Sequence, residues 1–282
     1  MFIWLASYPK SGNTLLRAML SAYFFSDDGK FNFELIKFIK QFPQAELFEK
    51  LNIDLNFESM VQNYIKVQES INIKNSIQFV KTHSAFFNIN NHRFTDYENS
   101  LGVIYIVRDP RNVVTSFSKF NGISIEESTD YLINENYLEK GHPLNPSKNF
   151  LNYSGTWKYN YNSWKEFKSQ RKYLLVKYED LVDNKKIILI KIIKFIFNLK
   201  KIKPKINLEK LDNIIESTSF ENMQLLEKRF GFNEAIIDPL SGERRQFFNM
   251  GKKNKWQEII NEKVKKKIEN SFKKEMNELN YL

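Results

Sequence analysis

The chain has 282 residues, a formal net charge of +10 and no cysteine. Without cysteine there can be no disulfides, no thiolate catalysis and no cysteine-ligated zinc, and the three histidines (His83, His92 and His142) are too far apart to show metal-ligand spacing. The positive charge suits an anionic ligand, a nucleic acid or an acidic surface, and much of it reflects a general richness in lysine.

We predict a single domain over residues 1–282, because the length suits one large core and no Gly/Ser/Pro-rich linker divides it. Phe2–Ala6 is apolar, but no basic region precedes it as in a signal peptide. Ile187–Leu199 is interrupted by two lysines and is too short to span a bilayer, so it predicts a buried helix. We therefore expect a soluble, cytoplasmic protein.

Four short apolar runs are typical of buried strands in a parallel sheet: Phe2–Ser7, Ile77–Thr82, Val103–Val107 and Tyr173–Tyr178. Helical periodicity follows the first, third and fourth runs, and the last of these helices is Lys185–Leu199. Such alternation predicts an α/β fold, a doubly wound parallel sheet of about four to five strands flanked by helices.

Two segments, 27–75 and 121–153, are too long for a simple crossover. The first should form helices of its own, and the second, which is polar, aromatic and asparagine-rich, should cover one end of the sheet. Ligands of such sheets bind beyond the carboxyl ends of the strands, so we expect both insertions to shape a substrate pocket or a lid.

The first strand runs directly into Tyr8-Pro9-Lys10-Ser11-Gly12-Asn13-Thr14 and then into a helix. A helix start offers unpaired N–H groups and a positive dipole end, and Gly12 lets the backbone approach a ligand. Lys10 adds a charge. The lysine precedes the glycine, so this is not the nucleoside-triphosphate loop. The sequence predicts an anion site, with an ordinary capped turn as the alternative.

Two further strands also end in functional side chains. His83 follows the second strand, where a histidine could act as a general base or serve only the fold. Arg108 follows the third strand, where its guanidinium could grip a phosphate or pair with a core carboxylate. We interpret His92 and His142 as surface residues or lid contacts.

The stretch from Tyr8 to Thr14 resembles the 5′-phosphosulfate loop of the cytosolic-type sulfotransferases, and further matches follow in family order to about Gln257. The resemblance implies a P-loop-like fold that transfers a sulfuryl group from 3′-phosphoadenosine 5′-phosphosulfate (PAPS), without a metal, to a hydroxyl or amine. It implies that His83 deprotonates the acceptor. Lys10 would bridge the sulfuryl group and the leaving oxygen, while Lys81 stabilises equatorial oxygens.

The same resemblance implies a donor site in which Arg108 and Ser116 contact the 3′-phosphate, and other motifs surround the nucleotide. Its residues are Pro9, Lys10, Ser11, Gly12, Asn13, Thr14, Arg108, Ser116, Tyr178, Thr218, Phe220, Phe247 and Gly251.

Three positions depart from the family pattern. Asn249 and Met250 stand where the family has Arg and Lys, so two cations for the 3′-phosphate are lost. Leu15 stands where many members carry a tryptophan that stacks on the adenine. Cations near the first two positions could replace the lost pair: Arg244, Arg245, Lys252 and Lys253.

Two other functions remain open on the sequence. A kinase-like nucleotide-dependent protein would need a different loop order and magnesium ligands. A basic protein that binds RNA or another anion, with a degenerate nucleotide site, would suit the lysine-rich helix Lys263–Lys274, which we interpret instead as a solvated face. The presence of Lys10, His83, Arg108 and Ser116 together favours the enzyme and makes a nucleic-acid partner the less favoured interpretation. The acceptor is not readable from the sequence, and anionic compounds and carbohydrates are among the candidates.

Overall fold

The computed structural model describes residues 1–73, 76–140, 151–238 and 241–282. Its centre is a five-stranded parallel sheet in the order β2-β3-β1-β6-β9. The strands are β1 (Phe2–Ser7), β2 (Lys40–Gln41), β3 (Gln78–Thr82), β6 (Ser100–Val107) and β9 (Tyr173–Lys177). The predicted α/β class is confirmed, and each of the four apolar runs forms a strand. The fifth strand, β2, comes from the 27–75 insertion.

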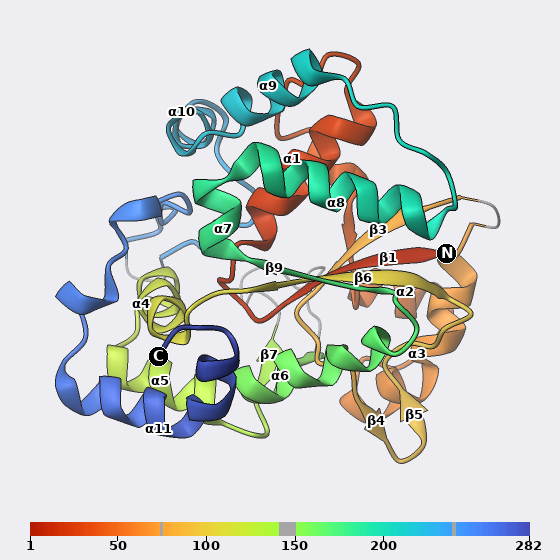
Figure 1. The fold of residues 1–282 in the computed structure, drawn as a ribbon. Coiled ribbons are helices and arrows are strands. Elements are labelled where there is room, and N and C mark those ends of the chain that lie inside the picture. Colours follow the sequence, from red (N-terminus) through yellow and green to blue (C-terminus); the bar gives the residue numbers. More distant parts are fainter. Residues whose placement is uncertain (74–75, 141–150, 239–240) are drawn as a thin grey trace.

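Alternate residues of the buried strands feed two separate cores, as strand geometry requires. Ile3, Leu5 and Ile104 belong to one core, whereas Trp4 and Tyr105 belong to the other. Helices cover both faces (Figure 1): α1 (Asn13–Phe25), α8 (Lys185–Leu199) and α9 (Leu208–Ser217) on one, and α3 (Phe57–Ile71), α6 (Trp157–Ser163) and α11 (Glu262–Glu278) on the other.

Helix α4 (Pro110–Asn121) carries Ser116, one of the predicted site residues, and local signals set both of its ends. The Asp109 side chain accepts a hydrogen bond from the Arg111 N–H at the start, where Pro110 occupies the first turn. Gly122 ends the helix in the left-handed conformation, with φ of 68°. The helix therefore starts two residues after Arg108, directly beyond the carboxyl end of β6.

The remaining elements lie mostly in the two insertions and in the carboxyl-terminal third. They are η1 (Leu35–Phe38), α2 (Ala45–Glu49), β4 (Asn88–Ile89), β5 (His92–Arg93), α5 (Ile125–Ile133), β7 (Leu138–Lys140), β8 (Leu151–Tyr153), η3 (Trp164–Lys168), α7 (Tyr178–Asp183), α10 (Phe220–Phe230), η4 (Gly251–Lys253) and η5 (Trp256–Glu258). The first insertion forms helices as expected, and the second contributes α5 and the β7–β8 pair. His142 lies outside the described residues.

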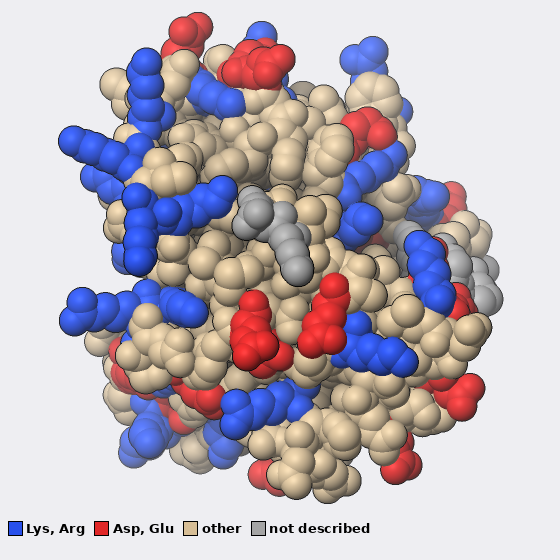
Figure 2. Space-filling model, turned by 90° about the vertical axis from the view of Figure 1, so that its right-hand side faces the viewer, with Lys and Arg blue, Asp and Glu red and all other residues tan. Residues whose placement is uncertain are grey.

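The positive charge of the chain is not gathered only where the predicted anion loop lies. Figure 2 shows the side of the molecule at which the strands begin, and Lys and Arg line one margin of that face too. The lysines of α11 face solvent, while Val264, Ile268 and Phe272 of the same helix are buried.

Within the described ranges, no helix combines the length and apolarity needed to cross a membrane.

Candidate functional site

The carboxyl ends of three adjacent strands bring predicted catalytic and donor-binding residues together. Strand β1 lies between β3 and β6, with Ala6 paired to Thr82 and Ser7 to Ile106. His83 and Arg108 follow these two neighbours within two residues, so they meet the loop that follows β1 at one edge of the sheet. This convergence follows from the parallel order of the strands and is the geometry expected of a ligand site in such sheets.

The loop between β1 and α1 turns on two residues in the left-handed region, Lys10 with φ of 65° and Gly12 with φ of 101°. Gly12 is the N-cap of α1, and no side chain caps that helix start. A Cβ at Gly12 would lie 2.3 Å from Cδ2 of Tyr178. The Asn13 amide nitrogen donates to the Leu5 carbonyl at 2.8 Å. The loop is therefore held to its own strand, and its helix start is left open.

The Lys10 ammonium packs on two aromatic rings, 3.6 Å from the ring centre of Phe120 and 4.3 Å from that of Phe247. Burial first of all, and then the nearby cations Arg108 and Lys81, lower the pKa of Lys10 to about 7. An anion placed beside this ammonium would relieve the repulsion. Lys10 is therefore well placed to bind an anionic ligand.

Arg108 lies across the same loop with its guanidinium 4.3 Å from the Tyr178 ring centre. It donates from Nη1 to the Lys10 carbonyl at 3.2 Å. Its Nε and the hydroxyl of Ser11 are both buried and have no hydrogen-bond partner within the described part of the chain. No carboxylate among those residues pairs with Arg108, so pairing with a core acid does not account for it. Buried donors left unpaired are costly and indicate a missing acceptor.

His83 is 9% exposed and is oriented by β1. Its Nδ1 lies 2.9 Å from the Ser7 carbonyl, which can only accept, so Nδ1 carries the proton and Nε2 keeps a lone pair. The Asn160 amide donates to the His83 carbonyl at 2.9 Å. Burial and then the Lys81 charge lower the pKa of His83 to about 3, so the ring is neutral at physiological pH. A neutral imidazole with a free Nε2 can accept a proton.

Glu234, in the segment after α10, was not foreseen from the sequence. One of its carboxylate oxygens lies 3.4 Å from the Lys81 ammonium, and the other pairs with Arg17. Burial alone would raise the pKa of Glu234, but the two cations hold it well below its usual range. No local motif marks this glutamate, because its partners are distant in sequence. Glu234 is the counter-charge that Lys81 and Arg17 share, so this pair of cations keeps a net positive charge.

Some of the predicted nucleotide-binding residues that come later in the chain contact the loop around Lys10. Phe247 contacts Lys10 and Tyr178 contacts Gly12, as described above. A Cβ at Gly251 would lie 2.9 Å from the Phe220 ring, so those two predicted residues pack together. Ser116 lies one helical turn before Phe120 on α4, on the face directed toward Lys10. The Thr218 hydroxyl donates to the Ile214 carbonyl at 2.7 Å, which ties it to its own helix.

Two of the four proposed replacement cations are already paired. Arg245 binds Asp238 through two hydrogen bonds of 2.9 and 2.7 Å, and Lys252 binds Asp183 at 2.9 Å. A different cation reaches the altered position instead: the Lys119 ammonium donates to the Asn249 side chain at 3.3 Å. Lys119 is three residues beyond Ser116 on α4, so the two side chains lie on neighbouring positions of the helix surface. The sequence contains this spacing, but only the tertiary structure brings Lys119 to Asn249.

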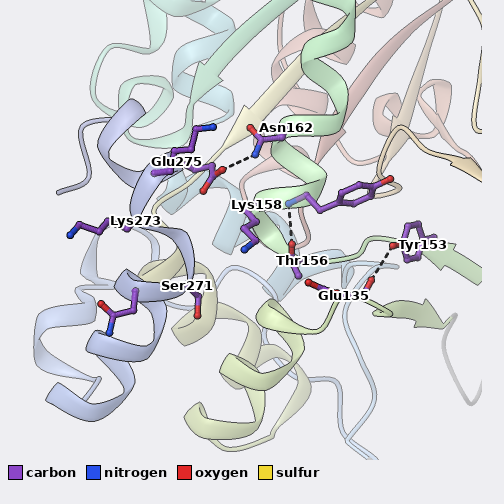
Figure 3. Close-up of a pocket in the computed structure, with 11 residues that line it drawn as sticks. Glu135, Tyr153, Thr156, Lys158, Asn162, Ser271, Lys273 and Glu275 are labelled. Atoms are coloured by element: carbon purple, nitrogen blue, oxygen red, sulfur yellow. Dashed lines mark hydrogen bonds between the residues drawn. The ribbon is translucent and has the colours of Figure 1, made fainter.

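A separate cavity of about 710 Å³ opens between α6 and α11 (Figure 3). The Asn162 amide donates to Glu275 across it at 2.8 Å, and Lys158 and Lys273 lie at its margin. None of the predicted site residues lines this cavity. Among the described residues there is also no group of three or more His, Asp or Glu side chains that could hold a metal ion.

Comparison with known proteins gives one family and several solved structures. The model of the sulfotransferase domain family matches residues 2–280. An amine sulfotransferase from Oryctolagus cuniculus is 23% identical over 184 residues, which is 63% of this chain and 55% of that protein. The chain thus matches little more than half of that relative.

Two solved structures share the fold. Mouse sulfotransferase SULT7A1 complexed with PAP has a TM-score of 0.56 and 19% identity, covering 97% of this chain and 83% of that one. Retinol dehydratase in a complex with retinol and PAP has a TM-score of 0.62 and 17% identity, covering 98% and 81%.

Proposed function

The chain belongs to the sulfotransferase domain family, and we propose that it transfers the sulfuryl group of PAPS to a hydroxyl or amine of an acceptor. The observation that carries the proposal is the pair of buried, unpaired donors on Ser11 and Arg108, beside an uncapped helix start and the Lys10 ammonium. These groups fit the phosphate and sulfate oxygens of such a donor. PAP in the two structural relatives supports the same choice.

In this proposal the loop from Pro9 to Thr14 binds the 5′-phosphosulfate, and Arg108 with Ser116 binds the 3′-phosphate. Tyr178, Phe220 and Gly251 surround the nucleotide, together with Thr218 and Phe247. Lys10 holds the oxygen that leaves with the nucleotide, because its ammonium gains most where negative charge develops. Lys81 stabilises the equatorial oxygens of the transferring group, as the cations of phosphoryl-transfer enzymes do.

His83 is the proposed general base. Its proton lies on Nδ1, so Nε2 is free to take the proton of the acceptor as the nucleophile attacks sulfur. In the protein without ligand, the pKa of His83 is low because of burial and because of the Lys81 cation. A bound anionic donor would raise that pKa toward the range of an effective base, since an opposite charge favours the imidazolium form. The donor would thus activate the base that uses it.

The test is a transfer assay with radiolabelled sulfate donor against sugars, lipids, phenols and amines, together with calorimetric titration of PAP. We expect PAP to bind without added metal and at least one acceptor class to become labelled. Failure to bind PAP, combined with magnesium-dependent binding of ATP, would contradict the proposal and support the kinase-like alternative. The amine sulfotransferase and the retinol complex make amines and alcohols the first acceptors to test.

A further inference from the structure

The β7–β8 pair places an acidic residue beside the proposed acceptor position. Glu139 of β7 is the direct cross-strand partner of Asn152 of β8, so the two side chains lie on one face of the pair. The chain continues from β8 into Ser154, whose hydroxyl donates to the His83 carbonyl at 3.1 Å. The Ala85 N–H donates to the Tyr153 carbonyl at 2.8 Å. Hydrogen bonds therefore hold the strand pair against residues 83–85, the segment that includes the proposed base.

Glu139 lacks a cationic partner among the residues that the structure describes. It accepts one hydrogen bond, from the Asn152 amide at 3.0 Å, and forms no ion pair with any described side chain. Burial raises its pKa, while Lys81 and Lys10 lie near enough to oppose that rise. Lys81 is already paired with Glu234. If Lys10 pairs with the sulfuryl donor, Glu139 is left as an uncompensated carboxylate.

Asn152 supplies a second, independent sign of a missing group. It is fully buried, and its side-chain oxygen has no hydrogen-bond partner among the residues described. An amide oxygen and a carboxylate are both acceptors, so neither can satisfy the other once the Asn152 N–H bond to Glu139 is made. Both call for a ligand with several N–H donors. Asn152 is a buried polar group, and such groups are normally paired, whereas Glu139 is only partly buried.

The surroundings of Glu139 are aromatic. The rings of Tyr8 and Tyr137 lie 6.5 Å apart between centres. Burial first, and Glu139 in addition, raise the pKa of both tyrosines, so both hydroxyls stay neutral beside the carboxylate. Aromatic rings next to an acid favour a cation over a neutral or anionic group.

We propose that Glu139 and Asn152 bind a protonated amine of the acceptor, so that the preferred acceptors are hydroxyl-bearing amines whose hydroxyl faces His83. The inference rests on the proposed sulfuryl transfer. It assigns Glu139 a role in acceptor choice that no part of the donor site performs. An anionic acceptor would place like charges together and is disfavoured.

The experiment compares matched phenols that carry either an aminoalkyl arm or an alkyl arm of the same length, from one to four carbons. Their affinities for the PAP-saturated protein are measured by calorimetry, and their rates by sulfate transfer. The variants are Glu139→Gln, which keeps the shape of the side chain, and Glu135→Gln, which removes an exposed carboxylate nearby as the matched control. Thermal unfolding and PAP affinity establish that each variant is folded.

We expect the best amine to bind at least tenfold more tightly than its alkyl partner, since hydrogen bonds to charged groups have effects of this size. Glu139→Gln should remove that preference without weakening PAP, whereas Glu135→Gln should keep it. Equal affinity within every pair, or a preference that survives Glu139→Gln, overturns the inference even if transfer to the alkyl phenols proves the proposed function. If PAP does not bind, the proposed function fails, and the same affinities measured without PAP still test the amine site.

Discussion

The two ends of the proposed donor site are built on different kinds of structure. The end that meets the sulfuryl group lies at the carboxyl ends of β1, β3 and β6, where Lys10, His83 and Arg108 are held by strand pairing and backbone hydrogen bonds. The end that would meet the 3′-phosphate depends on the irregular segment 244–251. There, two family cations are absent and two nearby ones are bound to carboxylates.

We infer from this difference that the first end determines the rate of transfer, whereas the second end determines the selectivity for a 3′-phosphate. Residues on a sheet edge are positioned by many cooperative contacts, so each has a narrow set of orientations and a large effect when it is removed. At an irregular segment, a neighbouring element can supply a charge that the segment lacks, and Lys119 of α4 reaches Asn249 in this way. We therefore expect large losses of rate from changes at the sheet edge and smaller, ligand-specific changes at the other end.

The largest effect should follow removal of the base. His83→Ala should lower transfer to hydroxyl acceptors by about 10²–10⁴-fold, the usual contribution of general base catalysis. PAP affinity should be retained, because the base acts on the acceptor and not on the nucleotide. Steady-state rates and a PAP titration on the same preparation make the comparison. Loss of PAP binding would assign His83 to the donor site instead.

Lys10→Ala should lower turnover by at least two orders of magnitude, since a single preorganised donor at developing charge contributes about 10²–10³-fold. The fold should survive, because among the described residues the ammonium packs on the rings of Phe120 and Phe247 and forms no ion pair. Turnover and the melting temperature are measured together. Near-normal turnover by a folded variant would remove the loop from the mechanism.

Arg108→Ala should abolish the preference for a nucleotide that carries a 3′-phosphate. A charge-assisted hydrogen bond contributes about 1.5–3 kcal/mol, so PAP affinity should fall at least tenfold while that of adenosine 5′-monophosphate changes less. Calorimetric titration of both ligands provides the comparison. If the unmodified protein binds the two ligands equally, Arg108 recognises something other than a 3′-phosphate.

The depressed Lys10 pKa of about 7 predicts a pH dependence. The cationic form dominates below pH 7 and is lost above it, so anion binding should weaken as pH rises from about 6 to 8. Lys10→Arg stays charged over this range and experiences the same titration of the ligand. The ratio of unmodified to Lys10→Arg affinity for PAP should therefore fall up to about tenfold. A constant ratio would show that Lys10 is not near its titration point.

The smallest effects belong to the irregular end. Restoring the family pair with Asn249→Arg and Met250→Lys should tighten PAP binding by a few-fold and leave adenosine 5′-monophosphate unchanged. Lys119→Ala should weaken PAP by a similar factor, about that of one exposed charge pair. The exposed Lys266→Ala on α11 is the matched control. Equal changes for both nucleotides would mean that this end does not contact the 3′-phosphate.

Local sequence was enough to predict four of the five strands of the sheet and the residues that follow three of them. Apolar runs bounded by turns identify four strands, and the helix Lys185–Leu199 has the bounds that its periodicity predicted. Lys10, His83 and Arg108 each follow a strand within three residues, so the parallel sheet brings them together by necessity. The physical reason is that strands have a regular geometry, and that the burial of a strand can be predicted from the apolar residues that follow one another in its sequence.

Tertiary structure alone decided which charges surround those residues. Glu234 meets Lys81 from 153 residues away, and Lys119 meets Asn249 from 130 residues away. Glu139 reaches the site only because the β7–β8 pair is fastened beside His83. Contacts of this kind depend on loop paths and on the balance between burial and charge pairing, for which no short pattern exists. The sequence therefore predicted that Lys10, His83 and Arg108 would meet beyond the carboxyl ends of the strands, whereas the fold determines which charged residues surround them and which residues form the proposed acceptor site.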